Sequence, residues 1–321
     1  MRGLFSTAVI FFFSVSIATA GADETAPSLI ANGRVDEAIA SLHGQITASP
    51  NDAQAHNLLC RAYFSLGEWD RGISDCEKAV ALAPGNSQFH LWLGRIYGEK
   101  ADGSSFIAAA GLARRVRSEF ETAVRLNPAN VDARSDLAEF YIEAPGVIGG
   151  GRDKAVAQAS SLATIDPITA HGVKARIAEK GKDFTTAEQE LRAAITASHG
   201  SASGWLNLGL FYKHRRQFDQ MEKALQHVRS APLDRADALV DAADILIHTQ
   251  RNLPEATQLL RAYLTSNAKV EQAPAFKVHF LLGAANEELG RKKDAASEYR
   301  TALSMAKEFR PAQQALQRVS Q

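Results

Sequence analysis

Residues 53–84 read AQAHNLLCRAYFSLGEWDRGISDCEKAVALAP, and this stretch decides the fold. Its apolar residues recur every three or four positions, first as far as Leu66 and again from Ile73, which is the spacing of one helical face. Gly67 separates the two runs, and Pro84 ends the second because proline cannot continue a helix. The stretch predicts two short helices folded against each other. Such a hairpin cannot bury its own apolar face, so it requires neighbours.

The same hairpin recurs along the chain. The position of His56 is repeated at intervals of 34, 44, 37, 34, 35 and 39 residues, so the base period is 34 and the longer intervals contain insertions. The equivalent positions are His90, Arg134, His171, Trp205, Val240 and His279. A period of this size predicts stacked helix pairs that share one continuous core.

The repeat resembles the tetratricopeptide-repeat family, whose pattern is W-x2-L-G-x2-Y, then A-x3-F, then P. Trp205, Leu208, Gly209 and Tyr212 match its first half in full. The resemblance implies an all-α, right-handed superhelical solenoid of antiparallel helix pairs, with about eight repeats. We expect residues 22–48 and a helix at about 309–320 to be caps, and insertions near 98–115 and 143–154.

The first 20 residues predict a signal peptide. Arg2 precedes an apolar run from Leu4 to Ile17, and Ala18-Thr19-Ala20 supplies the small-x-small pattern of a cleavage site. We expect cleavage after Ala20, leaving residues 21–321 as an exported solenoid, periplasmic or secreted. The apolar run is shorter than the roughly 20 residues that span a bilayer, so no stable membrane insertion is expected after cleavage.

Composition gives no sign of nucleic-acid binding, because 36 Lys and Arg balance 36 Asp and Glu. No Ser-His-Asp or Cys-His set is apparent, so we expect neither an enzyme nor a cofactor. The histidines at the repeated position are expected to pack between helices. Equivalent positions on stacked helices lie about 8–10 Å apart, too far to share one zinc ion, so no metal site is expected.

In the family geometry, the first helix of each repeat lines a concave groove. Arg61 and Arg95 hold equivalent positions one repeat apart, so both charges are expected to point into this groove. Asp136 and Glu139 follow and reverse the sign. The candidate groove residues for binding a protein or peptide segment are Asn57, Arg61, Phe64, Trp92, Arg95, Asp136 and Glu139. The family's carboxylate-clamp pattern of Lys and Asn is not reproduced.

Two features leave alternatives open. Cys60 and Cys76 lie at matching heights on either side of the hairpin turn, so they form a disulfide or remain two small core-filling thiols. The second feature is a glycine-rich segment before a helix start, which is either a connector or an anion site. The residues of that possible anion contact are Gly149, Gly150, Gly151, Arg152 and Lys154.

The leading hypothesis is a non-catalytic scaffold that binds a protein or peptide segment in its groove. An alternative is an envelope assembly or maintenance factor in which the array is a structural spacer. A remote alternative is a small-anion-binding or enzymatic role of the loop at 143–155. No oligomeric state is predicted.

Overall fold

The computed structural model describes residues 25–321, and the expected signal peptide and its cleavage site lie outside these residues. The described chain is all-helical, without a strand. Its first half contains α1 (Ala26–Ala31), α2 (Val35–Ala48), α3 (Ala53–Leu66), α4 (Trp69–Leu82), α5 (Ser87–Asp102), α6 (Phe106–Leu126), α7 (Val131–Glu143), the short 3-10 helix η1 (Gly146–Ile148) and α8 (Arg152–Leu162). Its second half contains α9 (Pro167–Lys180), α10 (Phe184–Ala197), α11 (Ala202–His214), α12 (Phe218–Val228), α13 (Ala238–His248), α14 (Leu253–Thr265), α15 (Ala275–Glu288), α16 (Lys292–Met305) and α17 (Arg310–Val319).

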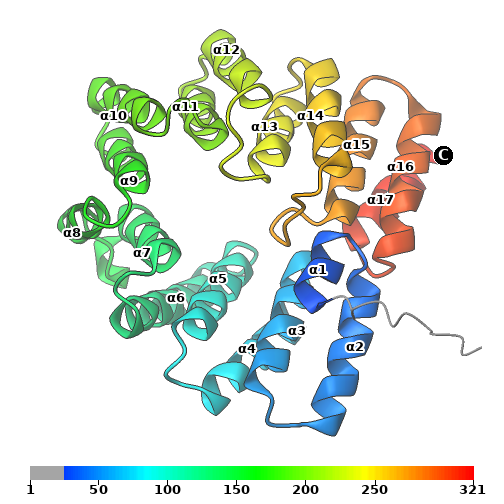
Figure 1. Ribbon diagram of the computed structural model, residues 1–321, viewed down its shortest axis with the longest axis horizontal. Coiled ribbons are helices and arrows are strands. Elements are labelled where there is room, and N and C mark those ends of the chain that lie inside the picture. The colour runs from blue at the N-terminus through cyan, green and yellow to red at the C-terminus, as the bar shows by residue number, and fades with distance from the viewer. Residues whose placement is uncertain (1–24) are drawn as a thin grey trace, which may run out of the picture.

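Consecutive helices pack in pairs, which confirms the predicted solenoid (Figure 1). Side chains just before the first helices of the pairs satisfy free backbone N–H groups: Asp52, for example, accepts a hydrogen bond from the amide of Ala55 at 3.0 Å. Such caps start α3, α5, α7, α9 and α11, at Asp52, Asn86, Asn130, Asp166 and Ser201. Local chemistry therefore sets where these five helices begin.

A disulfide joins Cys60 of α3 to Cys76 of α4, with the two Cα atoms 5.3 Å apart. Both residues are fully buried. The bond links the two helices of the hairpin that also carries part of the inner wall described below.

The first and last helices of residues 25–321 meet, so the solenoid closes into a ring (Figure 1). We call this contact the terminal seam. Its apolar residues are Leu29, Ile30, Val35, Ala38, Ala62 and Leu66 from the first helices, and Phe276, Ala302, Ala306, Phe309 and Ala312 from the last. Both terminal segments were expected to be caps; instead each end covers the apolar face of the other. The apolar faces at the two ends are shielded from solvent by packing on each other rather than by polar capping helices.

Polar contacts border the terminal seam. Arg71 donates to Glu308 at 2.7 Å, and the backbone amide of Lys307 donates to Asp36 at 3.2 Å. At its centre Gly33 has a positive φ of 85°, and a Cβ added there would lie 2.8 Å from Met305 Sδ and 2.9 Å from the backbone nitrogen of Phe276. A side chain at residue 33 would therefore push the two ends apart.

Two long connections turn into the ring, after α12 and after α14 (Figure 1). The second is held by Tyr263, whose side chain is fully buried. The Tyr263 hydroxyl donates to the carbonyl of Ala273 at 2.7 Å and accepts from the amide of Val270 at 2.9 Å. This connection is therefore a fixed wall of the interior.

Along residues 25–321, none of the helices combines the length and apolar character that crossing a bilayer requires.

Candidate functional site

The ring encloses two adjoining cavities of about 650 and 590 Å³. They share the residues Val131, Asp132, Ser135, Thr169, Asp234 and Arg235, so they form one continuous space, which we call the inner channel. Its walls come mainly from the first helices of the repeats and from the connections before α13 and α15. At one end it reaches Arg61, and at the other His214.

An aromatic junction organises the Arg61 end of the inner channel. The guanidinium carbons of Arg61 and Arg95 each lie 5.1 Å from the centre of the Trp92 ring. Phe64 meets Trp92 edge-on, with ring centres 5.5 Å apart. Arg95 also donates through Nε to Asp136 at 2.6 Å. Five of the predicted groove residues thus surround one cavity, and Glu139 lines the adjoining one.

Asn57 lies elsewhere. It is 1% exposed and is not part of the channel wall, and its side-chain nitrogen Nδ2 has no hydrogen-bond partner. Helix α3 packs against α1, α2, α4 and α5, so less of its surface faces the interior than an open groove would leave. The expectation that Asn57 faces a ligand is corrected accordingly.

The two predicted arginines do face the channel, but each already holds a carboxylate. Arg61 is paired with Glu271, which lies 210 residues away in the sequence, and Arg95 is paired with Asp136. Burial raises the pKa of Asp136, and the neighbouring Arg95 opposes that rise. A ligand in the channel must therefore share or displace these carboxylate partners.

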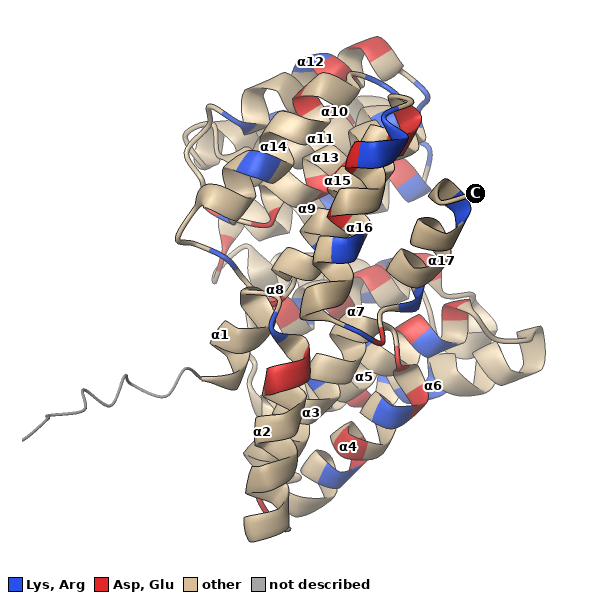
Figure 2. Ribbon diagram, turned by 90° about the vertical axis from the view of Figure 1, so that its right-hand side faces the viewer, with Lys and Arg blue, Asp and Glu red and all other residues tan. Residues whose placement is uncertain are grey.

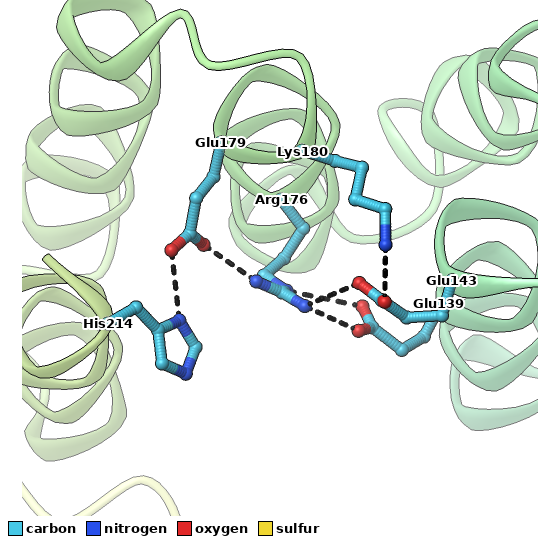
Figure 3. Close-up of polar contacts among 6 residues, drawn as sticks. All are labelled: Glu139, Glu143, Arg176, Glu179, Lys180 and His214. Atoms are coloured by element: carbon cyan, nitrogen blue, oxygen red, sulfur yellow. Dashed lines mark hydrogen bonds and ion pairs between the residues drawn. The ribbon is translucent and has the colours of Figure 1, made fainter.

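A second ion-pair network lies at the other end of the channel (Figure 3). Arg176 on α9 donates to Glu139 at 2.7 Å and to Glu143 at 3.1 Å on α7, and to Glu179 at 2.6 Å. His214 on α11 approaches Glu179 at 2.9 Å. Although burial acts to raise it, hydrogen bonds from His214 and Arg176 hold the pKa of Glu179 below its usual value. Charges of opposite sign thus link α7, α9 and α11.

Carboxylates outnumber cationic side chains in the inner channel. Burial in the ring also lowers the pKa of Lys277, which weakens its hold on a proton. The eight carboxylates are those of Asp132, Asp136, Glu139, Asp166, Glu179, Asp234, Asp237 and Glu271, and the five cationic residues are Arg61, Arg95, Arg176, Arg235 and Lys277. The channel is therefore acidic, which favours a cationic ligand.

The glycine-rich segment does not offer an anion site. The amides of Gly149, Gly150 and Gly151 donate to the carbonyls of Gly146, Pro145 and Tyr141, at 2.9, 3.2 and 2.9 Å. Lys154 donates to the carbonyl of Gly149 at 2.9 Å, and Arg152 is exposed at the start of α8. The segment is folded on itself, so these three amides are not available to bind an anion. This corrects the anion contact considered from the sequence.

Close packing explains the glycines of this segment. A Cβ at Gly149 would lie 1.8 Å from Arg117 Nη1, and one at Gly150 would lie 1.8 Å from the carbonyl oxygen of Ala144. Arg117 itself donates to the carbonyl of Ile148 at 2.9 Å. The glycines therefore let the connection wrap around an arginine of α6.

The partners of the repeated histidines were not predicted. In each case Nδ1 approaches a carboxylate of the second helix: His56 with Asp75 at 2.8 Å, His90 with Glu119 at 2.6 Å, His171 with Glu190 at 2.6 Å and His279 with Glu298 at 2.7 Å. Three carboxylates follow their histidine by 19 residues, and Glu119 follows by 29 because of the ten-residue insertion. This spacing was visible in the sequence. The pairs tie the two helices of a repeat together.

His90 is held between two acceptors. Its Nδ1 faces Glu119 and its Nε2 lies 3.0 Å from the carbonyl of Pro84, so only the doubly protonated ring satisfies both. The hydrogen bond to Glu119 raises the pKa of His90 above the ordinary value of 6.5, while burial opposes it. The charged histidine therefore stabilises the fold.

Similarity to known proteins agrees with this architecture. The family model described as tetratricopeptide repeat matches residues 24–87 and 249–313, the two regions that meet at the terminal seam. The predicted tetratricopeptide-repeat resemblance is confirmed in these two regions, and a fold of this kind suggests a protein-interaction scaffold. No curated protein matches the chain.

The solved structures that are similar to this chain have low sequence identity to it, and the first of them shares its fold. The crystal structure of yeast Tom70 is 15% identical in sequence, with a TM-score of 0.53. The match covers 89% of this chain and 58% of the Tom70 chain, so this chain spans little more than half the length of Tom70. A thermophilic tetratricopeptide-repeat protein from Thermus thermophilus is 17% identical over 68% of this chain and 94% of that one, with a TM-score of 0.45. A tetratricopeptide repeat protein from Parabacteroides merdae is 16% identical over 84% and 99%, with a TM-score of 0.40.

We expect Glu119→Gln to lower the free energy of unfolding by about 1 kcal/mol at acidic pH, because the charged hydrogen bond to His90 is lost. Since the pKa of His90 is raised in the folded state, this contribution is complete below the ordinary histidine pKa of 6.5 and disappears as pH rises through the folded-state value. Urea unfolding of both proteins across this range measures the difference. A gap that grows with rising pH would contradict the assignment.

Proposed function

We propose that this protein is a non-catalytic scaffold whose inner channel binds a cationic segment of a partner protein. The observation that carries the proposal is the continuous acidic space along the first helices of the repeats, from Arg61 to His214. The ion pairs of Arg95 and Arg176 orient neighbouring carboxylates, and the excess carboxylates attract lysine or arginine side chains of the partner. Each contact is modest, and specificity comes from their sum over several repeats.

Export of the scaffold is part of the same proposal. The apolar run and the Ala18-Thr19-Ala20 pattern support removal of a signal peptide, and the Cys60–Cys76 disulfide suits an oxidising compartment. The scaffold then acts on proteins of the periplasm or the cell exterior.

Ser135→Trp tests the channel, because Ser135 lines both cavities and the larger side chain fills the space between them. We expect a fluorescent oligolysine peptide to bind the wild type better than an oligoglutamate of equal length, and Ser135→Trp to weaken oligolysine binding at least about tenfold. Fluorescence anisotropy measures both. The matched control is Ser297→Trp on the exposed surface of α16, which should bind like the wild type.

Two results would contradict channel binding: unchanged oligolysine affinity in Ser135→Trp, or tighter binding of oligoglutamate. Unchanged affinity in Ser135→Trp would favour the alternative in which the array serves only as a spacer between larger partners.

The export proposal is tested by intact-mass and non-reducing peptide mapping of the protein recovered outside the cytoplasm. We expect a chain that begins at Gly21 and contains one peptide pair linked through Cys60 and Cys76. A chain that begins at Met1, or one with two free thiols, would contradict it.

A further inference from the structure

The α5–α6 hairpin overhangs the rest of the solenoid. Helix α6 has 21 residues against 14 in the equivalent α4, and the extra turns come from the insertion in the 44-residue interval. At its start Phe106 is 88% exposed and Ile107 is 85% exposed, the highest values among the exposed large apolar residues of the described chain. In Figure 2 the uncharged end of α6 projects from the body.

Basic residues follow this apolar end without intervening acids. Residues 103–118 contain Arg114, Arg115 and Arg117 but no Asp or Glu. Arg115 is paired with Glu77 at 3.2 Å and Arg117 with Glu121 at 3.7 Å, while Arg114 is exposed. Arg114 lies seven residues after Ile107, which is about 10 Å along the helix.

We propose that the end of the α5–α6 hairpin inserts into the surface of an anionic lipid bilayer. Phe106 and Ile107 enter the boundary between headgroups and acyl chains, a depth of about 5–10 Å. The rise along α6 then places Arg114 at the level of the lipid phosphates, where a cationic side chain is attracted. The attachment is peripheral and reversible, and no helix crosses the bilayer.

The size and shape of the hairpin end favour lipid over a protein partner. Two aromatic or aliphatic side chains bury only about 150–250 Å² each. A stable protein interface requires about 800 Å² on each side and a complementary surface. A bilayer accepts a convex apolar end without a preformed pocket, and its affinity grows with each apolar side chain buried. The same argument disfavours pairing of this end with a second copy of the chain.

The proposal predicts how the mature chain binds vesicles of equal parts phosphatidylcholine and phosphatidylglycerol. Co-sedimentation should detect binding of the wild type, and Phe106→Ser with Ile107→Ser should weaken it at least about tenfold. Arg114→Gln should weaken it several-fold and reduce its salt dependence, because one phosphate contact is lost. Phe106→Trp should show a blue-shifted emission that brominated lipids quench.

The matched control is Val147→Ser. Val147 is 83% exposed, but it neighbours Ile148, whose carbonyl accepts a hydrogen bond from Arg117. Arg117 lies 11 residues after Phe106, which is about 16 Å further along α6. Val147→Ser should therefore leave vesicle binding unchanged. The proposal is overturned if the wild type does not bind vesicles, if the double serine variant binds equally well, or if Val147→Ser loses as much. It is also overturned if light scattering shows that Phe106 and Ile107 hold a dimer together.

Discussion

The rest of this structure depends on the packing of its two ends against each other. A stack of helix pairs has an uncovered apolar face at each end, and exposure of that face is unfavourable. In this protein Phe276 and Phe309 of the last pairs pack on the same cluster as Leu29 and Ile30 of the first pair. Each end therefore serves as the cap of the other. This contact turns an open groove into a ring with an enclosed channel.

Closure changes the electrostatics of the interior. In an open groove Arg61 would be solvated; in the ring it is paired with Glu271. The Arg95–Asp136 pair joins neighbouring repeats and does not depend on closure. Both pairs are partly buried, so the cost of removing their charges from water offsets much of their attraction, and their main effect is to fix side-chain positions. The remaining carboxylates are held together in a restricted volume. The selectivity that we propose for a cationic partner rests on this crowding rather than on any single residue.

Much of the fold could be predicted from the sequence, because helical periodicity and the 34-residue interval are local signals. The groove was predicted in part: Phe64, Trp92 and Arg95 lie on the channel wall, whereas Asn57 is buried. The pairing of Arg61 with Glu271 was out of reach, since it depends on how the small rotations between repeats add up over 210 residues. The histidine–carboxylate pairs are different, because their 19-residue spacing was present in the sequence and was overlooked.

Cross-linking across the terminal seam tests ring closure most directly. In Arg71→Cys with Glu308→Cys, the new thiols replace side chains whose polar atoms lie 2.7 Å apart. With the native disulfide intact, a short bismaleimide should link them within one monomer. Adding Gly33→Ala should lower the yield, whereas Gly290→Ala, with a φ of 73° and no atom near the added Cβ, should not. Absence of the intramolecular link, or links only between chains, would show an open solenoid and contradict the enclosed channel.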